Sequence, residues 1–295
     1  MTATTPGRLQ SGRASTTAGL TALMRAVDAR LPAHRRLADD DHAHHFAAYN
    51  PRFKYYSYRP WTARLALRLF DRAFGGFLAE ILLRGRHFDA VLADARAAGI
   101  DQVLQLGAGY DSAALRHPDL RFIEVDHPAT QRTKLAVLAK AGVTASNVTY
   151  VPVNLETDPL AEALKRHGFD QGRPTLVGWH GVTFFLQPES FQRALAGIAA
   201  ICAPSSRLVF DYMDASVIDG TSPYRSARMA ARAVARRGEP YTLGMSAASA
   251  ATAAEAAGFH CLQNLRVTDL IDRFGGERPY CARHDFMGVL TVERR

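Results

Sequence analysis

The residues best placed to bind a ligand in this 295-residue chain form a short glycine turn. Gly107, Ala108 and Gly109 follow the apolar run 103–106, which is typical of a strand buried on both faces. The two glycines carry no Cβ, so the backbone can turn tightly and approach a ligand closely. Asp111 brings a carboxylate to the same turn. This pattern predicts a ligand-binding turn that joins a buried strand to a helix.

Asp111 and Ser112 indicate which ligand the turn holds. A dinucleotide-binding turn, G-x-G-x-x-G, has a third glycine where this chain has Ser112. Such a turn brings helix N–H groups onto a pyrophosphate, and the carboxylate of Asp111 would repel that anion. A ligand with a cationic centre and no phosphate fits better. S-adenosylmethionine meets both conditions, because it carries an amine, a sulfonium and a ribose but no phosphate.

A second carboxylate, Asp126, ends the next predicted strand, about twenty residues after the turn. In that position it can accept hydrogen bonds from both ribose hydroxyls. Glu124 would share the same face of the strand, because side chains repeat every two residues. We prefer Asp126 as the ribose ligand, because ligands of open α/β sheets bind at the carboxyl ends of the strands.

Strands and helices alternate from residue 103 to residue 213, which predicts a parallel sheet with right-handed crossovers. Two more strands follow near the C-terminus. We therefore expect an α/β fold with a Rossmann-like, mostly parallel sheet of seven strands and helices on both faces. The predicted strands are 103–106, 120–126, 148–154, 174–180, 207–213, 260–267 and 286–292.

Helical periodicity and end signals place helices between these strands. Ser15, Thr16 or Thr17 can cap the first helix, and Gly99 can end the helix that precedes the first strand. The predicted helices cover 20–31, 61–83 with a break at 75–76, 90–98, 113–116, 128–141, 160–167, 188–202 and 252–257.

Composition along the chain indicates how it is organised. Residues 1–14 are rich in Gly, Ser, Thr and Arg without periodicity, so we expect them to be disordered. Residues 15–99 are predicted to form an N-terminal helical cap, and residues 100–295 the ligand-binding core. Within that core, the Arg-rich segment at about 214–240 is predicted to be a lid insertion with a solvated helix.

Composition and charge also limit the class of protein. Hydrophobic residues make up 47% and charged residues 22%, as in ordinary globular domains. No apolar run reaches the roughly 18–20 residues that span a membrane, and no secretory signal is visible. The three cysteines are far apart, which favours the cytoplasm. The net charge of +8 can attract nucleic acid, but no dense basic block with interleaved aromatics supports that partner.

Three histidines, His42, His44 and His45, follow three acidic residues and raise the question of a metal site. Their spacing suits no common site, because helical metal-binding pairs need i and i+4. We therefore expect no metal, and interpret the acidic residues as the opening of a helix.

Several motifs together resemble class I methyltransferases of the leucine carboxyl methyltransferase family, in the bacterial branch that includes polyketide O-methyltransferases. The resemblance covers roughly residues 20–290. The glycine turn followed at this distance by Glu-Val-Asp-x-Pro is its most specific part. The motifs are Arg84–Asp89, Leu104–Ser112, Phe122–Pro128 with Lys134 after it, Val153–Glu156 and Gly181–Leu186.

The resemblance implies S-adenosylmethionine as the cofactor and a role for each matching residue. It implies that Arg84 binds the methionine carboxylate, onto which a guanidinium can form two parallel hydrogen bonds. Gly107 would lie against the cofactor, and Asp126 would hold its ribose. Asn154 and Leu155 would flank the adenine, where the family often has Asp at the first position.

His180 is the main departure from the family pattern. The family usually has Glu directly before the Gly-Val pair at 181–182, where that side chain reaches the methionine end of the cofactor. Three roles stay open for this histidine: a residue packed at a strand end, a cofactor contact, or a general base.

The resemblance predicts methyl transfer to an oxygen of a small molecule, such as a polyketide-like or other secondary metabolite. The enzyme would have to align the acceptor and exclude water. A carboxylate acceptor needs no base, whereas a phenol or enol hydroxyl benefits from one, for which His180 is the candidate. Arg and Tyr residues from 52–59 or from 221–241 could hold the acceptor.

Three other functions stay open. The positive charge suggests a protein or RNA methyltransferase. An NAD-dependent enzyme is disfavoured by Asp111 and Ser112. A repurposed fold that does not transfer methyl is the third option, because a fold does not fix a function. The oligomeric state is also open, with a homodimer as one option.

Overall fold

The computed structural model describes residues 15–38, 40–47, 59–74, 77–236, 238–275 and 284–295. The predicted disordered segment 1–14 lies outside the described residues, and so does nearly all of the stretch 52–59. No helix within the described ranges is long and apolar enough to cross a membrane.

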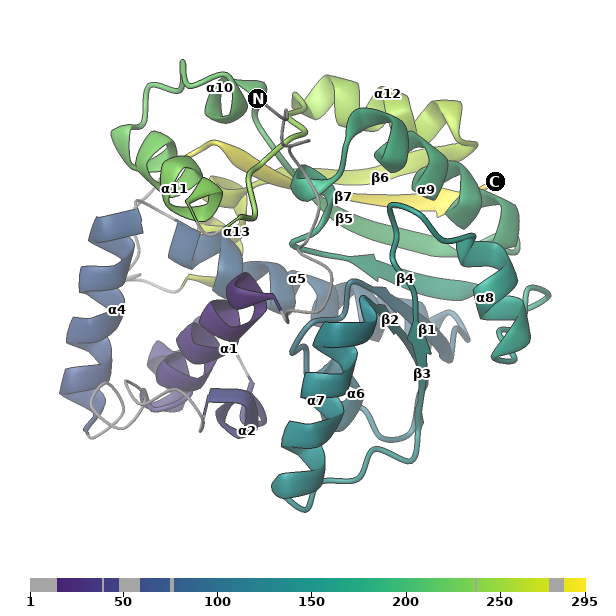
Figure 1. Cartoon of the computed structure of the whole chain (residues 1–295), viewed down its shortest axis with the longest axis horizontal. Coiled ribbons are helices and arrows are strands. Elements are labelled where there is room, and N and C mark those ends of the chain that lie inside the picture. Colours follow the sequence, from purple (N-terminus) through teal and green to yellow (C-terminus); the bar gives the residue numbers. More distant parts are fainter. Residues whose placement is uncertain (1–14, 39, 48–58, 75–76, 237, 276–283) are drawn as a thin grey trace, which may run out of the picture.

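Seven strands form one sheet (Figure 1). They are β1 (Gln102–Leu106), β2 (Arg121–Asp126), β3 (Val148–Pro152), β4 (Thr175–Trp179), β5 (Arg207–Met213), β6 (Phe259–Arg266) and β7 (Met287–Arg294). Their order is β3-β2-β1-β4-β5-β7-β6. β1 to β5 pair in parallel, and β7 pairs antiparallel with β5 and β6. The predicted Rossmann-like, mostly parallel sheet is therefore confirmed.

The strand order reverses at β1, which has β2 on one side and β4 on the other. Gln105 of β1 is in register with Gly178 of β4, so the turns that follow these two strands are neighbours. In open α/β sheets such a reversal leaves a crevice at the carboxyl edge, because the two following connections go to opposite faces. The register thus places the predicted glycine turn beside His180.

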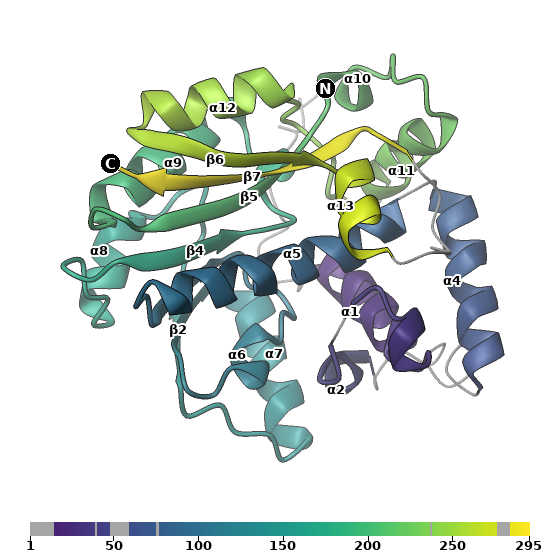
Figure 2. The same cartoon turned by 180° about the vertical axis from the view of Figure 1, so that it is seen from behind.

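Helices cover both faces of the sheet (Figures 1 and 2). Val103 belongs to an apolar cluster with one set of helices and Leu104 to a cluster with another, because successive side chains of a strand point to opposite faces. The first set is α5 (Phe77–Ala97), α6 (Ala113–Arg116) and α13 (Val267–Phe274), and the second is α8 (Leu160–Arg166), α9 (Pro188–Ile201) and α12 (Ala247–Ala256).

Helix α5 corrects the prediction of helices at 61–83 and 90–98. The first part ends as α4 (Pro60–Phe74), just before the predicted break at 75–76. The second part does not end at 83, because α5 runs without interruption from Phe77 to Ala97. The motif Arg84–Asp89 therefore lies inside a helix rather than ahead of one. Gly85 lies inside this helix, where a glycine costs only about 1 kcal/mol, which burial of the flanking apolar side chains outweighs.

The N-terminal helices pack against one another and against α5. They are α1 (Thr16–Asp28), α2 (Ala43–Ala47) and α4, to the left in Figure 1, and α2 also contacts α7 (Pro128–Lys140). The Ser15 side chain accepts a hydrogen bond from the N–H of Ala18, so it is the predicted cap of α1. Leu23 and Val27 of α1 join the apolar cluster beneath α5, so these helices share one core with the sheet.

Two segments of the C-terminal half bear on the predictions. The Arg-rich segment contains α10 (Ala215–Ile218) and α11 (Arg225–Ala235), and α11 exposes Arg232 while it buries Ala227.

Helix α13 was missed, because the predicted strand 260–267 hid its start. The side chain of Asp269 accepts a hydrogen bond from the N–H of Arg266, and this cap ends the strand and begins the helix.

Candidate ligand-binding site

A cavity of about 250 Å³ lies at the carboxyl ends of β1, β2 and β4, between the sheet and helices α1 and α5. This volume is many times that of one ordered water, so the cavity suits a metabolite. All nine residues predicted to bind the cofactor line it: Arg84, Gly107, Ala108, Gly109, Asp111, Asp126, Asn154, Leu155 and His180. The fold thus brings together residues from widely separated parts of the chain.

The turn after β1 requires its glycines. Gly107 has a φ of 63° and Gly109 a φ of 50°, in the left-handed region that favours glycine. A Cβ on Gly107 would overlap the side chain of Val182. The missing side chain therefore allows the turn after β1 to touch the turn after β4, and leaves backbone facing the cavity.

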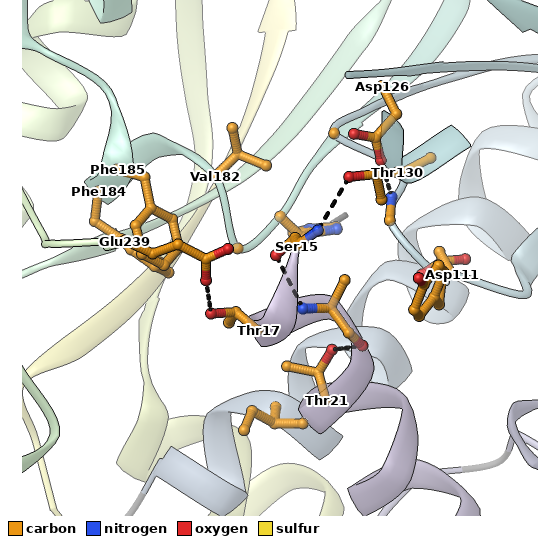
Figure 3. Close-up of a pocket in the computed structure, with 18 of the residues that line it drawn as sticks. Ser15, Thr17, Thr21, Asp111, Asp126, Thr130, Val182, Phe184, Phe185 and Glu239 are labelled. Carbon is orange, nitrogen blue, oxygen red and sulfur yellow. Dashed lines mark hydrogen bonds between the residues drawn. The ribbon is translucent and has the colours of Figure 1, made fainter. Parts of the chain in front are cut away.

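Asp126 presents its carboxyl group to the cavity (Figure 3). Its Oδ2 accepts a hydrogen bond from the N–H of Gly109, and its Oδ1 accepts one from the N–H of His127 at 2.6 Å. Burial raises the pKa of Asp126, although both backbone donors oppose that shift. Each oxygen keeps a further lone pair, so the carboxyl group can also accept hydrogen bonds from a ligand diol.

Asp111 gives the cavity a negative charge. Burial alone would raise its pKa, but Arg25, Arg116 and Lys134 together lower that pKa to about 2. Arg25 of α1 approaches Asp111 at 3.9 Å and donates a hydrogen bond to the carbonyl of Tyr110 at 2.7 Å. One arginine from the N-terminal helix thereby fixes the glycine turn, a role that the sequence did not reveal.

Asn154 and Leu155 follow β3 and line the cavity together. The Asn154 side-chain oxygen accepts a hydrogen bond from the N–H of Glu156 at 3.0 Å, which orients the amide. The replacement of a family Asp by Asn therefore keeps a polar side chain at this position.

Arg84 is held by two carboxyl groups. Its Nη1 donates to Glu80 at 2.5 Å and to Asp211 at 3.1 Å. Burial alone would lower the pKa of Arg84, but these two neighbours raise it above the usual range. Glu80 also lines the cavity, whereas Asp211 lies behind Arg84 and is fully buried.

His180 faces the cavity beside Arg84. Its ring packs edge-on against Phe88 of α5, with 5.2 Å between ring centroids. Burial and then Arg84 lower the pKa of His180 to about 3. The imidazole is therefore neutral at neutral pH, and its Nε2 has no hydrogen-bond partner among the described residues.

Aromatic rings form one end of the cavity. Phe77, Phe184, Phe185 and Tyr241 line it, and their contacting rings lie 5.0–6.1 Å apart between centroids. Burial and then Glu80 raise the pKa of Tyr241, so its hydroxyl stays protonated. This end can take a flat apolar molecule with a polar edge.

The start of α1 crosses the cavity toward residue 239 (Figure 3). Glu239 accepts hydrogen bonds from the N–H and hydroxyl of Thr16, at 3.3 and 3.4 Å, and from the hydroxyl of Thr17. On the other side, the N–H of Ser15 donates to the Thr130 hydroxyl of α7 at 3.3 Å. The helix start thus joins the predicted lid segment to the core.

Sequence reasoning missed several of these residues. Arg25, Glu80 and Glu239 lie on segments whose local pattern gives no hint that they meet in space. Tyr241, in contrast, belongs to the stretch 221–241, whose Arg and Tyr residues were expected to hold the acceptor. Asp211 left one signal, a carboxylate inside an otherwise apolar predicted strand. No group of three or more His, Cys, Asp or Glu that could hold a metal occurs in the described parts of the chain.

Comparison with known sequences identifies relatives. The family profile described as "Leucine carboxyl methyltransferase" matches residues 18–199. A Mycolicibacterium vanbaalenii protein named "Putative S-adenosyl-L-methionine-dependent methyltransferase" is 41% identical over 160 residues, which cover 51% of this chain and 52% of that protein. A Mycobacterium tuberculosis protein of the same name is 37% identical over 144 residues, 47% of this chain and 41% of that protein. The chain spans about half the length of the curated relatives that it matches.

Two solved structures share the fold. A DUF574 family protein from Streptomyces avermitilis superposes with a TM-score of 0.60 at 18% identity, over 98% of this chain and 100% of that chain. A Thermobifida fusca protein, "putative methyltransferase", gives 0.58 at 17% identity, over 97% of each chain. At such identities these likenesses concern the fold. Because the family profile covers more than half of its length, the chain belongs to the leucine carboxyl methyltransferase family.

Proposed function

We propose that this protein binds S-adenosylmethionine and transfers a methyl group to an oxygen of a small molecule. One observation carries the proposal: a single cavity holds the Asp126 carboxyl group, suited to a ribose, and the Arg84 guanidinium, suited to a carboxylate. Family membership and the names of the relatives support the same cofactor and methyl transfer in general.

The residues of the cavity fit each part of this cofactor. Asp126 can accept from the ribose hydroxyls, and Asn154 lies where the adenine would be recognised. Arg84 uses Nη1 for its own carboxyl partners and keeps other N–H groups for the methionine carboxylate. Asp111 contributes a negative charge to the cavity, which suits a sulfonium and opposes a pyrophosphate.

Glu80 can supply the carboxylate that the replacement of the family glutamate by His180 removes. The family usually has a glutamate where this chain has His180, and Glu80 lines the cavity beside Arg84. We assign Glu80 the role of binding the ammonium group of the cofactor. When bound, S-adenosylmethionine supplies an electrophilic methyl group on its sulfonium.

The acceptor that we propose is a small aromatic or similarly flat molecule, which includes polyketide-like metabolites. The support is the aromatic end of the cavity, where Phe77 and Phe184 are buried. Buried rings enclose a small molecule better than a protein loop or an RNA strand, so we place those acceptors second. The Tyr241 hydroxyl can donate a hydrogen bond to the acceptor.

His180 bears on the kind of oxygen that is methylated. A group with a pKa of about 3 is a weak proton acceptor, so this value weighs against the general-base role. A carboxylate acceptor is already ionised and needs no base. We therefore favour a carboxylate acceptor, with His180 as a neutral hydrogen-bond acceptor or packing partner.

Calorimetric titration with S-adenosylmethionine, with its demethylated product and with NAD tests the cofactor. We expect the first two to bind and NAD not to bind. Failure of both to bind would overturn the proposal. Matched pairs of aromatic carboxylates and phenols, assayed by mass spectrometry for the methylated product, then test the acceptor.

His180→Ala separates the roles of the histidine. The base role predicts a large loss of turnover on phenols with cofactor affinity unchanged, whereas a cofactor contact predicts the reverse. Cofactor binding with no transfer to any acceptor would instead favour a repurposed fold, which the His180 departure keeps open.

The proposal also covers the domains of the chain and the cell compartment in which the protein acts. We propose a cap at 15–99, a core at 100–295 and a lid at 214–240, in the cytoplasm. The support for the lid is the contact of Glu239 with α1 across the cavity. Limited proteolysis with and without S-adenosylmethionine tests it: we expect protection of 214–240, and unchanged cleavage there would contradict the lid.

A further inference from the structure

Asp211 is a carboxyl group buried within the sheet. Alternation along β5 places its side chain on the same face as Val209 and Met213, which belong to the apolar cluster beneath α5. None of its surface is exposed. Burial of a carboxyl group is costly unless its hydrogen bonds and its charge are both satisfied. Its position therefore calls for an explanation beyond packing.

One oxygen of Asp211 joins two parts of the cavity wall. Oδ2 accepts a hydrogen bond from Arg84 Nη1 at 3.1 Å and another from the N–H of Gly181 at 2.7 Å. Gly181 has a φ of 70°, and a Cβ there would lie 2.9 Å from Nη2 of Arg84. Asp211 thus fixes the guanidinium of α5 against the turn that follows β4.

The other oxygen has a different environment. Oδ1 is buried and has no hydrogen-bond partner among the described residues. Glu80 lies close by, because it accepts from the same Arg84 Nη1 at 2.5 Å that Asp211 accepts from at 3.1 Å. Burial first, and then the charge of Glu80, raise the pKa of Asp211 well above its usual range, although Arg84 opposes this shift. Two carboxylates beside one guanidinium would leave a net negative charge in a buried place. A proton on Asp211 removes that charge and makes Oδ1 a donor toward Glu80.

We propose that Asp211 is a positioning residue that acts as a neutral carboxylic acid, donating to Glu80 while it holds Arg84 and the Gly181 turn in place for the amino-acid end of the cofactor. The inference rests on the proposed cofactor and on the assignment of Arg84. Asp211 touches no ligand itself. Its effect is confined to the part of the ligand that Arg84 and Glu80 bind.

The test compares two ligands that differ by that part. S-adenosylhomocysteine carries the amino acid, and 5′-methylthioadenosine lacks it. We expect Asp211→Ala to weaken S-adenosylhomocysteine binding about tenfold or more, the usual loss with hydrogen bonds to a charged group. Binding of methylthioadenosine should stay within about threefold. Asp211→Asn should bind both ligands as the unchanged protein does, because an amide can donate to Glu80 and accept from Gly181.

Infrared difference spectra give a readout that a purely structural role would not move. The unchanged protein should show the carbonyl band of a protonated carboxylic acid, and Asp211→Asn should lack it. Asp214→Asn is the matched control, because Asp214 lies just beyond β5 and pairs with Arg266 at 2.8 Å. It should keep the band and both affinities.

Three results would overturn the proposal: no protonated-acid band assignable to Asp211, equal losses in Asp211→Asn and Asp211→Ala, or equal weakening of both ligands by Asp211→Ala. The infrared band and Asp211→Asn decide the matter even where Asp211→Ala does not fold. Arg84→Gln separates the assumptions, because unchanged S-adenosylhomocysteine binding in that variant would refute the role of Arg84. If the unchanged protein binds neither ligand, the proposed function itself fails.

Discussion

The two sides of the cavity are built in different ways. The core wall, which we define as Gly107–Asp111, Asp126 and Gly181–Val182, consists of turns and strand ends at the carboxyl edge of the sheet. Its hydrogen bonds are donated largely by backbone N–H groups. Its close packing depends on glycines, where a side chain would overlap a neighbour. Such a wall offers little room for substitution.

The opposite side depends on side chains. The cap wall, which we define as Ser15–Arg25, Glu80, Arg84 and 238–241, contributes guanidinium, carboxyl and hydroxyl groups from three separate segments. These groups reach one another and the core by hydrogen bonds between long side chains. Their positions can shift without a change in the path of the backbone.

The difference is also one of distance along the chain. Gly109 and Asp126 are 17 residues apart, whereas Arg84 and Asp211 are 127 apart and Thr17 and Glu239 are 222 apart. One strand–turn–helix unit with the next strand therefore sets most of the core wall, and Gly181–Val182 complete it from the turn after β4. The cap wall forms only when the whole chain has folded. We expect changes in the core wall to weaken cofactor binding more than changes in the cap wall do.

The largest effect should follow Gly107→Ala in the core wall. The new Cβ would overlap Val182 in a turn whose φ is 63°, so the backbone must move. We expect the free energy of unfolding to fall by about 2–4 kcal/mol, from overpacking plus backbone strain, and cofactor binding to become undetectable. Denaturant unfolding and calorimetric titration measure the two.

Gly99→Ala is the control, because Gly99 has a φ of 85° but open space around its Cβ position, far from the cavity. This variant introduces backbone strain but no overlap, so the free energy of unfolding should fall by about 1 kcal/mol without loss of cofactor binding. Equal behaviour of the two variants would mean that the contact with Val182 does not matter.

The second-largest effect on cofactor binding should follow Asp126→Asn in the core wall. The amide oxygen can accept from one of the two backbone N–H groups, but its NH₂ then faces the other donor. We expect about 10- to 100-fold weaker binding of S-adenosylhomocysteine and methylthioadenosine alike, since both carry the ribose. This pattern differs from that of Arg84 and Asp211, which act on the amino-acid end.

Asp101→Asn, just before the amino end of β1, removes an exposed carboxylate from the opposite edge of the sheet and should leave both affinities unchanged. A loss confined to S-adenosylhomocysteine in Asp126→Asn would contradict the ribose assignment.

The contrast between the walls explains what the sequence could predict. The glycine turn and Asp126 follow strand ends, so periodicity and turn chemistry located both, together with the order of strands and helices around them. Two helix predictions failed, each for its own reason. Packing of α5 against the sheet overrode the helix boundary predicted around 84–89. Helix α13 was missed although Val267, Leu270 and Ile271 recur at helical spacing, because the predicted strand 260–267 covered its start.

The contacts within the cap wall lay beyond such reasoning, and Arg84 was predicted only through the family resemblance. Nothing in the local sequence of Glu80 or Glu239 shows that they meet Arg84 or Thr17, because these pairings depend on tertiary packing. Asp211 was the one exception in principle. A carboxylate among apolar strand residues signals either a site or a structural pair, but its partners cannot be known from the strand alone.

Acid should destabilise the protein through two buried histidines, one on α5 and one packed against it. His87 of α5 contacts the Thr291 hydroxyl at 3.0 Å, and His180 packs on Phe88 of the same helix. Burial holds the pKa of His87 at about 4 and that of His180 at about 3, against 6.5 for an ordinary histidine. The unfolded chain takes up these protons first, so stability is full above pH 6.5 and falls as the pH drops toward 3–4.

We expect about 1–2 kcal/mol to be lost per histidine between pH 6.5 and pH 5. Urea unfolding across this range measures it. His87→Gln and His180→Gln should each flatten the dependence, whereas His34→Gln, at an exposed position, should not. Unchanged slopes in both buried variants would show that other groups carry the acid sensitivity.

The smallest effect should come from the contact of Glu239 with Thr16 and Thr17 within the cap wall. Figure 3 shows the part of this contact that Thr17 makes. Thr17→Val keeps the shape of the side chain but removes its hydroxyl, and Glu239→Gln removes the charge. Each should speed dissociation of S-adenosylhomocysteine by about two- to tenfold, the worth of one hydrogen bond, with little change in thermal stability. Stopped-flow displacement measures the rate.

Thr21→Val is the matched control, because the Thr21 hydroxyl lines the same cavity but donates only within α1, to the carbonyl of Ala18 at 3.0 Å. It should leave the dissociation rate unchanged. If Thr17 and Glu239 act as one contact, the double variant should be no faster than the faster single variant, because removal of either partner already breaks it. Additive effects would mean that each residue acts through a separate neighbour, and the cap wall would then close the cavity by independent contacts rather than by a single link between α1 and the lid segment.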